Sequence, residues 1–493
     1  MLDFIILLAF SVVLGLTIVL VLYYVLQNVV GSQNKKSSEG SDGTSSVKLV
    51  PGWDRKPSDP ENGDLDELSK HGSLHEYLLH LHQNGRQPIT MFWWGQQKVV
   101  SICSPELFKD TIKLTNRPKM LFTLFEPLIT ADSIQYANGQ EWEDRRKWLY
   151  ESLKGTFLEG YVPIFVKIAN ETARTWSKFG RGDVVELQEE FLTMTIKGVT
   201  RTCFGSVFNN EDEMRKMTHI YYQVFQEMEQ RMHIGPPEPG SDREKEFNDG
   251  VQQMRDKILS VVERRQSGEE KEDIPFIDAL LQSGVSHDQI ISEGITFMVA
   301  GLHTPGYLSV WAIHYLTLNQ DVYHNLVEEM KERVGSDKQG RLKDYVYDPN
   351  TLLRQVLNET LRLSVLAPYA ARYSDDDIVA GGYHIPANTP IVISLGVSLK
   401  NETVWKDTEK FDHTQCSHLQ GKDTMAFAPF GHGRRKCPGY MFAYVEVGVF
   451  LTTLLQQFTI KPVGEAKDVG RVHGLVTTPK EPLKYHIHPI EKL

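Results

Sequence analysis

A long uncharged segment at the N-terminus is the feature that most restricts how this chain can be arranged. From Phe4 to Leu26 the residues are mostly apolar and none carries a charge. A helix that crosses the core of a bilayer needs about 20 such residues. A basic segment before the run and a small-residue cleavage site, both typical of a cleaved signal peptide, are missing. We therefore predict a retained membrane anchor over residues 1–30; a buried core helix is the alternative, although such a helix seldom stays apolar on every face.

The charges that flank this run predict its orientation. Asp3 precedes the run, whereas Lys35 and Lys36 follow it, and positive charge favours the cytoplasmic side of a membrane. The rest of the chain is therefore predicted to be cytosolic. Residues 31–60 begin rich in serine and glycine and then contain prolines, which is typical of a flexible linker followed by a hinge. We place one folded domain at residues 61–493.

Composition narrows the class of the folded domain. With 41% hydrophobic and 24% charged residues the chain can bury a sizeable core. The net charge of -11 argues against a nonspecific nucleic-acid binder, which would need a strongly basic face. The four cysteines form no CxxC pair for zinc and no disulfide framework, which fits a reducing compartment.

Hydrophobic periodicity predicts a single large domain that is mainly α with a smaller β part (α+β). An aromatic and β-branched stretch at 90–103, broken at Gly95, predicts a β-hairpin. A second β-rich zone is expected at 372–397. Helices are predicted at 141–153, 164–179, 187–203, 213–232, 241–265, 286–318, 321–334, 351–363 and 438–457.

A basic, glycine-rich loop near the C-terminus points to an anionic sulfur. Residues 427–439 contain several glycines, and Arg434, Arg435 and Lys436 stand directly before Cys437. Glycine permits positive φ, so the loop can turn its N–H groups towards the sulfur. The proline after Cys437 suits the first turn of a helix, which would place the cysteine at a helix N-terminus. The helix dipole and the three cations would stabilise a thiolate there.

Such a thiolate can act as a nucleophile or as a metal ligand. A nucleophile needs a positioned base, and His432 is the one nearby in the sequence. The spacing of the loop resembles the haem-binding signature of the cytochrome P-450 family. Its fixed positions are Phe430, Gly433, Arg435, Cys437 and Gly439. The resemblance implies haem b with the Cys437 thiolate as the iron ligand, Arg435 at a propionate and Phe430 beside the sulfur.

Three further motifs lie at the family's usual distances. Glu359 and Arg362 are three residues apart, and as an exposed helical pair they would be worth only about 0.2–0.5 kcal/mol. They resemble the buried structural pair that the family carries behind the haem. Trp142, Arg146 and Arg372 resemble residues that meet the propionates, for which a forked guanidinium is suited. An ordinary surface role before an acidic run is the alternative for Arg372.

The segment 286–318 starts with a capping-box pattern and then stays largely apolar. Its centre, which includes Gly301 and Thr304, resembles the oxygen-activating helix of the family. Pro305 has no N–H to offer the carbonyl of Gly301, so a polar notch beside Thr304 is predicted, where dioxygen or water would sit. A core helix with a simple proline kink is the alternative.

Two departures from the family pattern affect this prediction. His303 stands where the family usually has an acid; an imidazole with a pKa of about 6.5 can relay protons, and packing on the far face of the helix is the alternative. Gln415 stands where an arginine usually joins the network of Glu359 and Arg362, and His413 replaces a proline. We therefore expect Glu359 to be served by Arg362 alone.

The stretches 72–78, 92–95 and 442–444 resemble animal cytochrome P-450 family 20, a group without an agreed substrate. The resemblance implies a monooxygenase in the endoplasmic reticulum membrane, with one span, that uses O2, a lipophilic small molecule and electrons from an NADPH-dependent flavoprotein reductase. The alternatives are a reductase-independent haem-thiolate isomerase or peroxygenase, a noncatalytic haem- or lipid-binding protein, and an anchored helical scaffold. Position relative to the motifs suggests that the pocket is lined by Phe297, Ala300, Leu366, Ala367, Tyr369, Leu475 and Val476.

Overall fold

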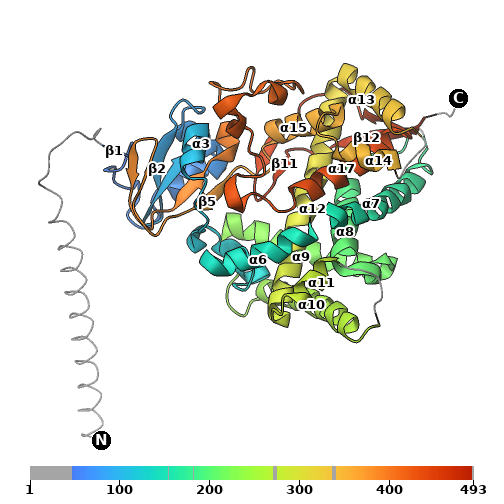
Figure 1. Cartoon of the computed structure of the whole chain (residues 1–493), viewed down its shortest axis with the longest axis horizontal. Coiled ribbons are helices and arrows are strands. Elements are labelled where there is room, and N and C mark those ends of the chain that lie inside the picture. The colour runs from blue at the N-terminus through green and yellow to red at the C-terminus, as the bar shows by residue number, and fades with distance from the viewer. Residues whose placement is uncertain (1–46, 154, 181, 270–274, 336–339, 491–493) are drawn as a thin grey trace, which may run out of the picture. The chain divides into compact units, whose positions relative to one another are not determined.

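The computed structural model describes residues 47–153, 155–180, 182–269, 275–335 and 340–490 (Figure 1). The predicted anchor at residues 1–30 lies outside these ranges. Within them, no helix combines the length and the apolar character that crossing a membrane requires.

The compact unit begins at Lys48, earlier than the predicted boundary at residue 61. Strand β1 (Lys48–Leu49) pairs in parallel with β7 (Tyr383–Ile385). Arg55 then forms an ion pair with the buried carboxylate of Asp64. The second half of the predicted linker therefore belongs to the fold, because these long-range contacts hold it in place and composition alone does not reveal them.

The long helices confirm the periodicity of the sequence. They are α6 (Gly139–Ser152), α7 (Gly155–Trp176), α8 (Leu187–Phe204), α9 (Glu211–Ile234), α10 (Asp242–Gln266), α12 (His287–Leu318), α13 (Gln320–Arg333), α15 (Leu352–Ser364) and α17 (Tyr440–Leu455). The shorter helices were not predicted, because a segment of one or two turns shows little periodicity. These are α2 (Leu65–Lys70), α3 (Leu74–Leu81), α4 (Pro105–Asp110), α5 (Glu126–Ile129), α11 (Pro275–Gln282), α14 (Gly340–Tyr347) and α16 (Leu395–Leu399).

The predicted hairpin is present and belongs to a sheet built from both ends of the chain. It consists of β2 (Ile89–Trp94) and β3 (Gln97–Ile102), with Gly95 at a φ of +56° in the turn. The sheet order is β2-β3-β8-β5, where β8 is Ile391–Ile393 and β5 is Ala370–Arg372. Figure 1 shows β2, in blue, and β5, in orange, in this one layer.

Three smaller sheets complete the β part. Their orders are β1-β7-β6, β4-β12-β9 and β10-β11. The strands not yet named are β4 (Val185–Glu186), β6 (Ile378–Ala380), β9 (Phe458–Pro462), β10 (Arg471–His473), β11 (Thr477–Pro479) and β12 (Lys484–Pro489). The predicted β-rich zone 372–397 is confirmed up to β8, but its last residues form α16.

Helix α12 is the central element that positions the site. Ser286 and Gln289 form the predicted capping box at its start. Its first half belongs to one buried cluster, with Leu302, and its second half to another, with Leu308. The helix continues through Pro305 as an uninterrupted helix. Its middle therefore lies where two cores meet. Figure 1 shows α12, in yellow, among the other helices.

Candidate active site

The loop before α17 has the curled backbone that its glycines predicted. Gly433 has a φ of +66°, and a Cβ there would lie 2.3 Å from the carbonyl oxygen of Ile112. The N–H of Cys437 donates to the carbonyl of Phe430 at 2.9 Å. Helix α17 starts at Tyr440, with Gly439 at its N-cap, so the proline after the cysteine lies in the preceding turn instead of in the first helical turn.

The Cys437 thiol is accessible but lies among protein groups. Its side chain is exposed, and yet burial raises the pKa of the thiol. A thiol can be exposed and still be surrounded by protein when its side chain lines a hollow inside the fold. The N–H of Gly439 and the cations Arg146, Arg117 and Lys436 act in the opposite direction and lower this pKa.

The sequence predicted that all three cations before Cys437 stabilise the thiolate, but the structure gives them different roles. Arg434 is directed at Glu143, at 2.6 Å, away from the sulfur. Lys436 lies over the ring of Tyr440, 3.7 Å from its centroid, and contributes to the field at the sulfur. Arg435 is buried and binds backbone carbonyls instead. The field at the sulfur is thus provided mainly by arginines from elsewhere in the chain.

Four arginines gather beside this loop without a carboxylate partner. They are Arg117, Arg146, Arg372 and Arg435. Arg435 donates to the carbonyl of Thr115 at 2.6 Å and lies 4.3 Å from the ring centroid of Trp142. Arg146 donates to the carbonyl of Lys436. None of the four has an ion-pair partner among the residues that the structure describes.

The cluster carries an unfavourable concentration of positive charge. Burial, and then the charges of Arg117, Arg372 and Arg146, lower the pKa of Arg435 to about 7. Burial and the charge of Arg117 lower the pKa of Arg372 to about 9. Because a guanidinium stays protonated in proteins, these shifts express the cost of holding four such charges together. An anionic group between them would remove that cost.

Arg117 was not predicted from the sequence. Its Nε is buried without a hydrogen-bond partner, and its side chain donates to Gln135. It precedes Pro118 in an irregular stretch with no motif around it. Arg372 was predicted, and its alternative as a surface arginine is wrong, because the side chain is 3% exposed and donates to the carbonyl of Ala371.

One face of α12 is accessible at the centre of the helix. Ala300 is exposed, and Gly301 and Thr304 are partly exposed, although most of the neighbouring α12 residues are buried. The hydroxyl of Thr304 donates to the carbonyl of Ala300 at 2.7 Å. A Cβ on Gly301 would lie 2.9 Å from the side chain of Val199, so this glycine also permits the close approach of α8. The predicted notch thus coincides with an accessible part of a buried helix.

His303 lies on a different face of α12. Its ring stacks on Phe225 of α9, with centroids 3.9 Å apart, and is 5.6 Å from the ring of Tyr221. Burial lowers the pKa of His303 to about 3, and its Nε2 is buried without a hydrogen-bond partner. These contacts match the packing alternative. The predicted proton relay through His303 has no hydrogen-bonded path among the described residues.

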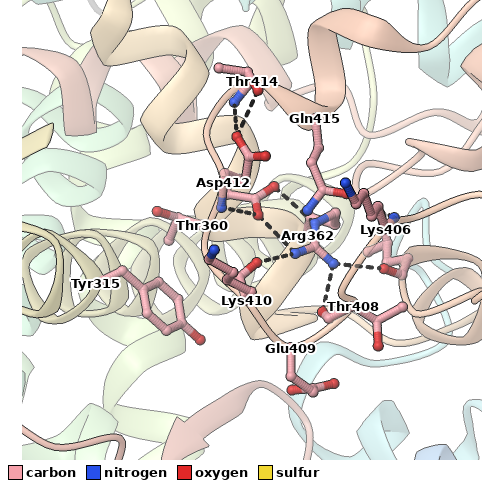
Figure 2. Close-up of polar contacts among 12 residues, drawn as sticks. Tyr315, Thr360, Arg362, Lys406, Thr408, Glu409, Lys410, Asp412, Thr414 and Gln415 are labelled. Atoms are coloured by element: carbon pink, nitrogen blue, oxygen red, sulfur yellow. Dashed lines mark hydrogen bonds and ion pairs between the residues drawn. The ribbon is translucent and has the colours of Figure 1, made fainter.

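The pair on α15 is buried and anchors a distant loop (Figure 2). Two hydrogen bonds of 2.8 Å join Arg362 to Glu359, and both side chains are fully buried. Arg362 also donates to the carbonyls of Thr408 at 2.8 Å and Lys410 at 3.0 Å. It makes a longer bond of 3.4 Å to the carbonyl of Leu399. The pair therefore fixes the backbone that leads into the cysteine loop.

Gln415 does not replace the missing arginine. Its Oε1 accepts from the N–H of Lys406 at 3.1 Å. Glu359 instead accepts a second partner, the N–H of Asp412 at 2.9 Å, so the expectation that Arg362 alone serves it is wrong (Figure 2). A backbone N–H compensates because the chain reverses beside the carboxylate. Burial raises the pKa of Glu359, while the hydrogen bonds from Arg362 and from the backbone N–H of Asp412 lower it.

The predicted pocket residues are only partly brought together. Leu475 and Val476 line a hollow of about 310 Å³ with Gln226 and Glu229 of α9. Phe297 packs against Phe276, with ring centroids 4.3 Å apart. The remaining predicted residues differ in accessibility: Ala300 and Ala367 are exposed, Leu366 is buried and Tyr369 is partly buried.

Comparison with known proteins now connects this geometry to a family. The family model of cytochrome P-450 matches residues 55–486. The chain belongs to the cytochrome P-450 family. Similar relatives are cytochrome P-450 20A1 of Bos taurus, 27% identical over 86% of this chain and 90% of the relative, and that of Homo sapiens, 26% identical over the same shares. The predicted likeness to family 20 is thereby confirmed.

The fold agrees with a solved cytochrome P-450. The crystal structure of the cytochrome P-450DA heme domain superposes with a TM-score of 0.77 at 17% identity, covering 90% of this chain and 98% of that chain. The predicted mainly helical fold with a smaller β part is confirmed, and the predicted cofactor, haem b with a cysteine thiolate as axial ligand, follows from family and fold.

The residues of this cytochrome P-450 fit that cofactor. An accessible thiol borders the interior, as an axial ligand must. Four guanidiniums without counter-ions match the two carboxylates that haem b carries. Phe430, expected beside the sulfur, packs 5.3 Å from the ring centroid of Tyr444. The assignment of each arginine to a propionate stays a prediction.

Proposed function

We propose that this cytochrome P-450 is a membrane-anchored haem-thiolate monooxygenase. It inserts one oxygen atom from O2 into a lipophilic small molecule, with electrons that an NADPH-dependent flavoprotein reductase supplies. The observation that carries the proposal is the set of arginines without counter-ions beside the accessible Cys437. The uncharged run at Phe4–Leu26 supports a single span in the endoplasmic reticulum membrane with the catalytic domain in the cytosol.

Each part of the site has a defined task in this reaction. When bound, haem with a thiolate ligand supplies the electron donation that favours cleavage of the O–O bond. Arg117, Arg146, Arg372 and Arg435 would hold the anionic edge of the group, and the ring of Trp142 packs against Arg435. The glycine turn at Gly433 keeps the loop close to Ile112 and so fixes the direction of the sulfur.

Thr304 lies on the accessible part of α12, and its hydroxyl can hold a proton there. Its hydroxyl donates to the carbonyl of Ala300, so its oxygen keeps lone pairs that can accept a hydrogen bond from water. Pro305 leaves the carbonyl of Gly301 without its usual helical donor, which makes a second polar group at the same turn. His303 contributes packing against α9 in this proposal.

The reduced carbon monoxide difference spectrum tests the ligand. The wild-type protein is expected to show the absorption of a thiolate-ligated complex, and Cys437→Ser is expected to lose it. Cys416→Ala is the matched control, because Cys416 lies in a separate buried cluster with Val365 and Trp405 and should keep the spectrum. A Cys437→Ser protein that keeps the thiolate spectrum would contradict the ligand assignment.

Turnover tests the reaction class. With reductase, NADPH and a lipophilic probe, oxygen uptake with formation of oxygenated product is expected. One observation favours a second candidate, a peroxygenase or isomerase that needs no reductase: His303, which stands at the acid position of the family pattern, is engaged in aromatic packing. Product formed with peroxide alone, and none with NADPH and reductase, would support that candidate. Haem binding without any turnover would support a noncatalytic carrier.

A further inference from the structure

Two histidines and a glutamate from opposite ends of the chain meet outside the haem site. His75 and Glu76 lie in α3, and His473 is the last residue of β10. One ligand atom from each residue lies within 4.8 Å of the others. The rings of His75 and His473 approach to a centroid distance of 4.4 Å. None of the three belongs to the cysteine loop, the arginine cluster or α12.

Hydrogen bonds determine which nitrogen of His473 carries a proton. The hydroxyl of Thr477 donates to the carbonyl of Val365 at 2.6 Å, because a carbonyl oxygen can only accept. That hydroxyl has one proton, so it must accept in its other contact, 2.9 Å from Nδ1 of His473. Nδ1 is therefore the protonated nitrogen. In the neutral ring, Nε2 then presents a lone pair.

This lone pair faces a carboxylate. Nε2 of His473 lies 3.5 Å from Oε1 of Glu76. Two acceptors that face each other repel unless a cation lies between them, either a proton or a metal ion. The Glu76 side chain is 48% exposed and that of His473 is 7% exposed, so the site is open to solvent on the glutamate side.

His75 contributes a buried imidazole, one nitrogen of which has no hydrogen-bond partner. It is 2% exposed, and its Nδ1 has no hydrogen-bond partner. A Cβ on Gly396 would lie 2.6 Å from Cε1 of this ring, so a glycine in α16 leaves the space that the imidazole occupies. Burying a ring nitrogen without a hydrogen bond is costly, and the space beside Gly396 accommodates the ring of His75.

Two cations lie near the cluster and act on both histidines, and a single carboxylate offsets one of their two charges. Arg471 and Lys400 both act electrostatically on His473. Arg471 binds Glu409 at 2.5 Å, and Lys400 binds the other oxygen of the same carboxylate at 2.8 Å. Their side chains are thus directed at Glu409, which leaves the carboxylate of Glu76 as the acidic group at the histidine pair.

We propose that His75, Glu76 and His473 form a binding site for a divalent cation of the zinc class. Two imidazoles and one carboxylate are a donor set that Zn²⁺ accepts, with metal–ligand distances of about 2.0–2.2 Å and a solvent position that completes the tetrahedron. Thr477 orients His473 in the way that outer-shell partners orient metal-bound histidines. The ion connects α3 to the β10–β11 hairpin, which joins the N-terminal and C-terminal parts of the fold.

Metal binding to the full-length, haem-loaded protein tests the site. After chelator treatment and incubation with ZnCl2, the wild type is expected to retain one equivalent of zinc, measured by elemental analysis, that a chromogenic chelator displaces in a single step. His80→Ala is the matched control, because His80 is an exposed histidine of the same helix and should leave affinity unchanged. X-ray absorption at the zinc edge should show two imidazole ligands.

Three variants separate the site from adventitious binding. Glu76→Gln changes a half-exposed side chain, so this variant should fold. Glu76→Gln and His473→Ala should each lower the affinity for zinc. Thr477→Val keeps the side-chain shape, and its expected loss of affinity is about 10-fold. Zinc should also raise the unfolding temperature of the wild type and of His80→Ala but not that of Glu76→Gln. The proposal is overturned if the wild type retains no stoichiometric zinc, or if Glu76→Gln and His473→Ala bind it as tightly as the wild type.

Discussion

Replacing either partner of the ion pair on α15 should destabilise the fold, but by different amounts. Glu359→Gln removes the carboxylate charge but leaves Arg362 with the carbonyls of Leu399, Thr408 and Lys410. Arg362→Met removes the guanidinium that serves these carbonyls and Glu359; the carboxylate of Glu359 keeps the N–H of Asp412, and the carbonyl of Thr408 keeps a 3.4 Å bond from Lys400. We expect Arg362→Met to be the more destabilising change, although both residues belong to one pair.

The magnitudes follow from the contacts. Breaking a buried ion pair by removing one partner costs about 3–5 kcal/mol. Glu359→Gln should lie at the lower end, because an amide oxygen still accepts from Arg362 or from the N–H of Asp412. In Arg362→Met the buried carbonyl of Leu399 loses its donor, which adds about 1–3 kcal/mol, and the part-buried carbonyls of Thr408 and Lys410 add less. A difference of about 1–3 kcal/mol between the two variants is therefore expected, a large fraction of the about 5–15 kcal/mol that stabilises a typical protein.

The difference should depend on pH. Burial raises the pKa of Glu359 in the folded protein, and removal of Arg362 should raise it further. A carboxyl whose pKa is higher in the folded state binds more protons when folded, so the stability it contributes falls as pH rises through that interval. Arg362→Met should therefore recover part of its stability relative to the wild type when the pH is lowered from about 8 towards 6, and Glu359→Gln should not.

Thermal and urea unfolding, followed by tryptophan fluorescence and by retention of the thiolate-type carbon monoxide spectrum, measures the order of the variants. Midpoints are compared instead of a single free energy, because a large cofactor-binding protein does not unfold in two states. Equal midpoints for Glu359→Gln and Arg362→Met, or a gap that does not change with pH, would refute the assignment of the backbone-anchoring role to Arg362.

Other predictions address the loop, the charge cluster and a buried acid. Gly433→Ala should lower haem retention, because a Cβ there would lie 2.3 Å from a carbonyl oxygen and the positive φ would add strain of about 1–2 kcal/mol. Gly431→Ala is the control: nothing lies within 4 Å of its Cβ, so this variant should show the strain alone. Arg372→Met should lower haem affinity without lowering the apo-protein's unfolding temperature, which titration and calorimetry measure, because it relieves buried positive charge. Burial raises the pKa of Glu293 to about 8, so wild-type stability should fall by up to about 1.4 kcal/mol per pH unit between pH 5 and 8, and urea midpoints of Glu293→Gln should lack this slope.

Local patterns were sufficient for much of the fold and for the centre of the site. The periodic helices, the hairpin at Gly95 and the capping box at Ser286 were predicted because their determinants lie within a few residues of one another. The Cys437 loop was recognisable for the same reason. Shorter helices such as α3 were not predicted, because they form against neighbours that the sequence does not identify.

Contacts between distant segments could not be predicted in the same way. His303 occupies the position of a family acid, but packing with α9 decides which face of α12 carries function. Arg434 and Arg435 are adjacent in sequence, yet one pairs with Glu143 at the surface and the other is buried beside Trp142. Composition and motif spacing cannot distinguish two such neighbours.

The sequence alone therefore determined the class of chemistry: a cysteine in a glycine loop, an ExxR-type pair, a long apolar helix and an uncharged N-terminal run. Only the tertiary structure decided which charges serve that chemistry. It added Arg117, turned Arg434 away and brought His75 to His473. The physical reason is range. Backbone conformation and capping depend on neighbours along the chain, whereas burial, desolvation and counter-ion pairing depend on which distant segments the closed fold brings together.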